Sequence, residues 1–104
     1  MIIENLHKLC NDETIQITDH ALKRCRERNI SLDEIKDCIM QGEIIEDYPD
    51  DYPFPSALVL GFVLKQPLHV VAGISDTDLW IISVYHPDPE KWESDFKTRK
   101  ENKK

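Results

Sequence analysis

The sequence is poor in glycine, and this excludes several common phosphate-binding and catalytic motifs. Its three glycines, Gly42, Gly61 and Gly73, are too far apart for a Gly-x-Gly loop, a Walker loop or a Gly-x-Ser-x-Gly nucleophile turn. A nucleotide-binding domain or a serine hydrolase of these types is therefore not expected.

Metal ligands and membrane segments are also missing. The three cysteines are odd in number and have no Cys-x-x-Cys spacing, so we expect reduced thiols and no disulfide framework. The four histidines, at positions 7, 20, 69 and 86, have no metal-ligand spacing. No apolar run approaches the length of a membrane span, and the N-terminus lacks the pattern of an export signal. We expect a cytoplasmic protein with no metal, no cofactor and no membrane association.

An overall positive charge is missing too, since the formal net charge is −7. A negative chain disfavours tight nonspecific binding to nucleic acid and suits a basic protein partner. The basic residues are nevertheless concentrated in "KRCRER" (23–28) and in "KTRKENKK" (97–104), where five of eight residues are basic. A local basic groove is therefore compatible with the acidic total.

The 104 residues predict one domain (1–104), with a core over about 14–97 and a basic flexible tail over 98–104. Periodicity and capping residues predict helices over 2–12, 19–28 and from Ser31 to Gly42. Strands are predicted over 14–18, 43–48, 56–65, 68–75 and 79–86, and a last helix over 90–99 that docks Trp92 on the sheet. This order predicts an α+β fold, with N-terminal helices packed on a four-stranded, mostly antiparallel sheet and a C-terminal helix.

The last predicted hairpin sets the faces of its side chains. A turn at residues 76–77 would place Gly73 opposite Trp80 and His69 opposite Val84. Tyr85 would then lie on the apolar, helix-facing side, and His69 on the other side. Both histidines of this region, at positions 69 and 86, are equally well explained as surface or edge residues.

The most distinctive local feature is a stripe of His20, Arg24 and Arg28 at i, i+4 and i+8 on the second helix. Arginine forks at this place suit phosphate oxygens, and the histidine can act as a base. The competing interpretation is a solvated helix face that has no ligand.

The stretch "TDHALKRCRERNISLDEI" resembles the opening of the domain of unknown function 4258 family, which begins Ser/Thr-x-His-Ala-x-x-Arg. Asn29 stands where that family usually has glycine. "LHVVAGI" and "LWIISVYHPDPEKWESDFKTRK" are similar to the second half of the same family. The family is grouped with RelE-like and barnase-like ribonuclease toxins, and its short members resemble MqsR-type toxins, which pair with an antitoxin that carries a zinc finger.

This resemblance implies a metal-independent endoribonuclease toxin whose partners are RNA and a cognate antitoxin, with a RelE/barnase-like fold. The ribose 2′-hydroxyl would attack phosphate, with His20 as base, Arg24 stabilising the phosphate, and Tyr85, or else His86, as acid. The expected substrate-binding residues are Arg28, His86, Lys97 and Arg99. The alternative is a non-catalytic protein-binding module of the same fold.

Overall fold

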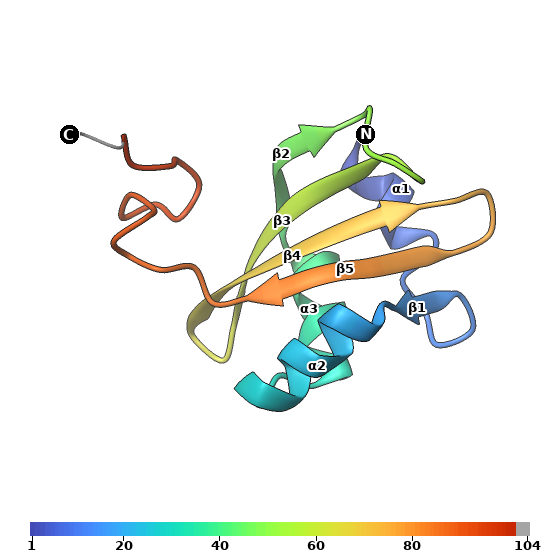
Figure 1. Cartoon of the computed structure of the whole chain (residues 1–104), viewed down its shortest axis with the longest axis horizontal. Coiled ribbons are helices and arrows are strands. Elements are labelled where there is room, and N and C mark those ends of the chain that lie inside the picture. The colour runs from blue at the N-terminus through green and yellow to red at the C-terminus, as the bar shows by residue number, and fades with distance from the viewer. Residues whose placement is uncertain (102–104) are drawn as a thin grey trace.

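The computed structural model describes residues 1–101, in which five strands form one mixed sheet in the order β1-β5-β4-β3-β2 (Figure 1). Their bounds are β1 Ile15–Ile17, β2 Glu43–Tyr48, β3 Ser56–Val63, β4 Gln66–Ile74 and β5 Leu79–Tyr85. Neighbours are antiparallel except that β1 is parallel to β5. The predicted four-stranded sheet is wrong, because the segment before the second helix adds a fifth strand at the edge.

Two of the three helices described have the predicted bounds, α2 at Asp19–Arg28 and α3 at Leu32–Gln41. Thr18 caps α2 by accepting a hydrogen bond from the Ala21 N–H at 3.1 Å, and Ser31 caps α3 in a capping box. The helix predicted over 2–12 is shorter in the structure, where α1 spans Ile3–His7. The Asn11 carbonyl accepts the N–H groups of residues 14 and 15, and this turn directs the chain into β1.

All three helices share one core with one face of the sheet. Its fully buried members are apolar side chains from both layers, including Leu6, Ala21, Ile35, Ile39, Val59, Val70 and Ile81. Helix α3 packs so closely on β3 that a Cβ atom at Gly61 would lie 2.8 Å from the Cα of Cys38. Within residues 1–101, no helix is long and apolar enough to cross a membrane.

A β-bulge changes which side chains share a face of the β4–β5 hairpin. Gly73 pairs with Trp80, as predicted, but the register shifts beyond Ala72, so that His69 pairs with Tyr85 and not with Val84. One extra residue in a strand reverses the alternation that follows it. His69 and Tyr85 therefore lie together on the face of the sheet away from the helices, where the sequence placed them on opposite faces.

The predicted C-terminal helix is absent, because residues 86–101 form an irregular segment with one isolated bridge, Trp92 to Arg99. Two local features prevent a helix. The Asp95 carboxylate accepts the N–H groups of Lys97 and Thr98 at 2.9 and 3.1 Å, and Phe96 has a left-handed φ of 58°.

Trp92 packs on the sheet as predicted, although the helix is absent. Its side chain is 4% exposed, and the centres of the Trp92 and His69 rings lie 4.6 Å apart. Of the predicted basic tail, residues 98–101 belong to this segment, and residues 102–104 lie outside the described part.

Candidate functional site

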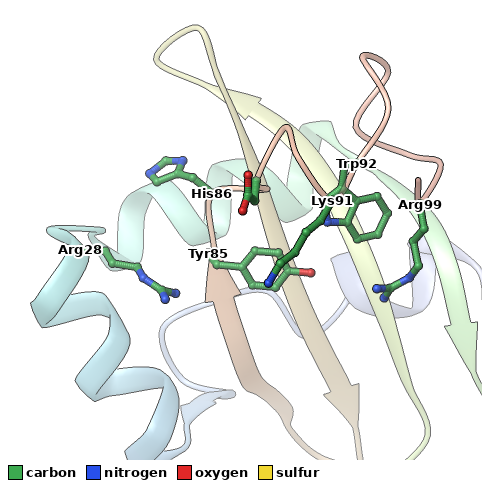
Figure 2. Close-up of a pocket in the computed structure, with 7 residues that line it drawn as sticks. Arg28, Tyr85, His86, Lys91, Trp92 and Arg99 are labelled. Carbon is green, nitrogen blue, oxygen red and sulfur yellow. The ribbon is translucent and has the colours of Figure 1, made fainter. Parts of the chain in front are cut away.

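A pocket of about 650 Å³ lies where the end of α2, the end of β5 and the C-terminal segment meet (Figure 2). Its lining contains three cationic side chains, one carboxylate, one imidazole and two aromatic rings. These belong to Arg28, Tyr85, His86, Asp88, Lys91, Trp92 and Arg99. A cationic pocket in a chain of net charge −7 is a local reversal of sign, which makes it the strongest candidate for binding an anion.

Arg28 enters the pocket from the last turn of α2. Its Nη1 donates a hydrogen bond to the Val84 carbonyl at 3.1 Å, which ties the helix end to β5 beside Tyr85. Figure 2 shows its guanidinium extending toward the Tyr85 ring, while Arg99 enters from the opposite side. The contact with Val84 uses one of the five N–H donors of the fork, and the others can bind an anion.

Tyr85 is hydrogen-bonded to His69, which is fully buried. The Tyr85 Oη atom lies 3.2 Å from His69 Nδ1, and His69 Nε2 lies 2.8 Å from the Phe96 carbonyl oxygen. Burial lowers the pKa of His69, and burial raises the pKa of Tyr85. Both side chains are therefore neutral near pH 7, and the phenol bridges the pocket and the buried imidazole.

His86 follows β5 directly and is exposed. Its Nδ1 lies 3.0 Å from the Pro67 carbonyl oxygen. Because a carbonyl only accepts, Nδ1 is the protonated nitrogen, and Nε2 is free to exchange a proton with a ligand.

Arg99 forms the far wall of the pocket and is already paired. Its Nε and Nη2 atoms donate to Glu46 at 2.9 and 3.0 Å, and its guanidinium lies 4.6 Å from the centre of the Trp92 ring. The hydrogen bonds from Arg99 hold the pKa of the Glu46 carboxyl below its usual value, and Tyr48 donates to the same carboxylate. Arg99 therefore fixes the C-terminal segment to β2, and much of its charge is compensated.

The structure brings together four of the seven residues singled out from the sequence: Arg28, Tyr85, His86 and Arg99. The other three lie outside the pocket lining. His20 is exposed in the first turn of α2, Arg24 pairs with Glu27 at 2.8 Å, and Lys97 pairs with Glu43 at 2.6 Å.

Sequence reasoning did not assign three residues of the pocket lining, Asp88, Lys91 and Trp92, to the site, and it also missed His69 behind Tyr85. The position of His69 depends on the β-bulge, which left no recognisable signal in the sequence. Among residues 1–101, no group of three or more His, Cys, Asp or Glu side chains could hold a metal ion.

Comparison with known proteins gives one match. Residues 17–86 match the family described as Domain of unknown function (DUF4258), which is more than half of the chain. No curated protein and no solved structure matches the chain.

Proposed function

The chain belongs to the DUF4258 family, and on this premise we propose that it is a metal-independent endoribonuclease, the toxin of a toxin–antitoxin pair. One observation carries the proposal. Arg28, Lys91, Tyr85 and His86 converge on a single pocket, with His69 directly behind the phenol.

Cleavage of RNA by its own 2′-hydroxyl requires three things of the protein. A base takes the hydroxyl proton, a cation stabilises the charge that develops on phosphate, and an acid protonates the leaving 5′ oxygen. Arg28 and Lys91 supply the positive charge, while Tyr85 and His86 supply two groups that can exchange protons. The attacking oxygen belongs to the substrate, so the reaction needs no metal-bound water.

The stripe on α2 gives this pocket an extension. His20, Arg24 and Arg28 lie along one side of the helix, and a rise of about 1.5 Å per residue separates successive members by about 6 Å. Arg28 is the member at the pocket. We assign Arg24 and His20 to contacts with phosphates that flank the cleaved one.

The toxin role rests on the resemblance of the DUF4258 family to RelE-like and MqsR-type ribonuclease toxins. The negative charge of the loop after β2 supports the idea that the antitoxin is a basic protein. In this loop Tyr52 is 95% exposed and follows two aspartates. The same observation favours the second candidate function, a non-catalytic module that binds a protein through this loop.

The decisive experiment incubates the purified full chain with end-labelled single-stranded RNA in excess EDTA. We expect products that end in a 2′,3′-cyclic phosphate, and no cleavage of the same sequence made with 2′-deoxyribose. Arg28→Ala and Lys91→Ala should each reduce cleavage, whereas Lys65→Ala, in the exposed turn after β3, should not. A folded wild-type protein that never cuts RNA, free or on ribosomes, would exclude the nuclease and leave the binding module.

A further inference from the structure

His69 is unusual in its surroundings. Among the described residues, the buried polar side chains are Ser56 and His69. A buried imidazole is costly unless its nitrogen atoms are hydrogen-bonded, and both nitrogens of His69 are. It is enclosed by Trp92 at 4.6 Å and by the Tyr85 ring at 5.2 Å between ring centroids. The charged groups that act on it are Glu46 from β2 and Arg99 from the C-terminal segment.

The two partners of His69 fix the direction of its hydrogen bonds. The Phe96 carbonyl can only accept, so Nε2 carries the hydrogen. In a neutral ring Nδ1 is then an acceptor, and the Tyr85 hydroxyl must donate to it. The phenol proton therefore points away from the pocket, and the oxygen lone pairs are left to face a ligand.

We propose that His69 is a positioning residue that acts through Tyr85, so that the phenol oxygen accepts the 2′-hydroxyl proton of the substrate. This inference rests on the proposed function and assigns Tyr85 as the base in place of the acid. As the 2′ oxygen bonds to phosphorus, its proton passes to Tyr85 Oη, and the phenol proton passes to His69 Nδ1. The bond from phosphorus to the 5′ oxygen breaks, and that oxygen takes a proton from protonated His86 Nε2. Proton exchange with water then restores both histidines.

The arrangement around His69 suits this role. The carboxylate of Glu46 favours the imidazolium that forms transiently, although burial and Arg99 oppose it. The Phe96 carbonyl holds the ring in one orientation, so Nδ1 stays aligned with the phenol.

The first test needs no RNA. Nitrogen-15 spectra of the imidazole groups in the whole protein should show His69 neutral, with its hydrogen on Nε2, and Tyr85→Phe should shift the Nδ1 resonance because its donor is lost. A hydrogen on Nδ1 of His69 would overturn the proposal.

The second test compares His69→Gln with a matched variant, His7→Gln. His7 also bonds a backbone carbonyl through Nε2, at 3.0 Å to Ile39, but lies outside the pocket. A glutamine can keep the hydrogen bond to Phe96 but cannot take up a proton. We expect His69→Gln to lose about 10²–10⁴-fold in cleavage rate and to lose the acidic limb of the kcat/KM profile. His7→Gln should keep both.

A variant of Tyr85, the side-chain partner of His69, separates an effect on folding from an effect on catalysis. Tyr85→Phe leaves His69 in place, and the double variant with His69→Gln should be no slower than either single one, because the two residues act as a unit. Additive losses, or a wild-type rate and pH profile in His69→Gln, would overturn this inference while the wild-type protein still cut RNA. Wild-type protein that cut no RNA would overturn the proposed function, and this inference with it.

Discussion

At the scale of single residues, the placement of a cation relative to the pocket decides which kinetic parameter it can affect. Arg28 lines the pocket, whereas Arg24 is held by Glu27 at 2.8 Å and His20 is exposed one helical turn further away. Groups that touch the reacting phosphate lower kcat when removed, and groups that bind flanking phosphates raise KM.

We therefore expect His20→Ala and Arg24→Ala to keep the wild-type circular dichroism spectrum, since exposed substitutions usually cost within about 0.5 kcal/mol. Each should raise KM for a single-stranded RNA and leave kcat nearly unchanged, measured by steady-state cleavage. Arg26→Ala, an exposed substitution on the same helix, is the control. A loss of about 10²–10⁴ in kcat for His20→Ala would instead identify His20 as the base.

At the scale of elements, helices with strong local signals were predictable and the C-terminal segment was not. Thr18 and Asn29 set the two ends of α2, and the pair Ser31–Glu34 sets the start of α3, each from within a few residues. Asn29 has the left-handed φ of 56° that a C-cap of this kind needs. The spacing of Trp92 and Phe96 also fits a helix. In this segment two contacts compete with a helix, the turn at Asp95 and the pairing of Arg99 with Glu46. Glu46 lies 53 residues away from Arg99 in sequence, so the second contact cannot be read from the local pattern.

Trp92 is the main apolar anchor of that segment. It is 4% exposed and covers His69, and truncating a buried aromatic residue costs about 3–5 kcal/mol. Trp92→Ala should lower the melting temperature by more than about 10 °C in differential scanning calorimetry. It should also move the pKa of His69 up toward that of an ordinary histidine, because burial is the largest cause of its shift. Lys91→Ala, the exposed neighbour, should leave the melting curve unchanged.

The pairing of Arg99 with Glu46 ties the same segment to β2, and the stability that this ion pair adds to the fold should depend on pH. The pKa of Glu46 is lowered in the folded protein, chiefly by Arg99. A depressed carboxyl pKa stabilises the fold above the unfolded value and loses that effect as pH falls through the folded value. Arg99→Ala should reduce the free energy of unfolding by at most about 1 kcal/mol at pH 7, since the arginine is mostly exposed.

In urea titrations, that difference between Arg99→Ala and wild type should shrink steadily as the pH is lowered from 5 toward 2. Glu46→Gln should show the same loss at pH 7. A difference that did not change with pH would mean that Arg99 stabilises the fold through its contact with Trp92 alone.

At the scale of the whole molecule, the strand count and the pocket depended on contacts between distant parts of the chain. The short segment 15–17 pairs with β5 across more than sixty residues, as Ile15 with Leu79, and so adds the fifth strand. The pocket needs α2, β5 and the C-terminal segment together. Sequence motifs identified four of its residues. Three of them, Arg28, Tyr85 and His86, lie at the ends of elements with clear signals, whereas Lys91 and His69 were placed only by the tertiary fold.

The effect of the acidic total charge on RNA association and the effect of charges at the cationic pocket should be distinguishable by varying the ionic strength. Asp88 lines the pocket, while Asp76 is exposed in the turn at the other end of β5. Seven residues of strand at about 3.3 Å each put the two ends roughly 23 Å apart. That distance exceeds the Debye length of about 8 Å at 0.15 M ionic strength and is less than the roughly 30 Å at 0.01 M.

Asp88→Asn should therefore speed RNA association at both ionic strengths, in stopped-flow measurements with a labelled single strand. It keeps the side-chain oxygen that accepts the Glu90 N–H at 2.9 Å, so the turn is preserved. Asp76→Asn removes the same charge and should speed association at 0.01 M only. Equal effects of the two variants at 0.15 M would show that RNA does not enter this pocket. At that ionic strength salt screens the charges that lie far from the RNA, so only a phosphate bound close to Asp88 can make the loss of the Asp88 carboxylate differ from the loss of the Asp76 carboxylate.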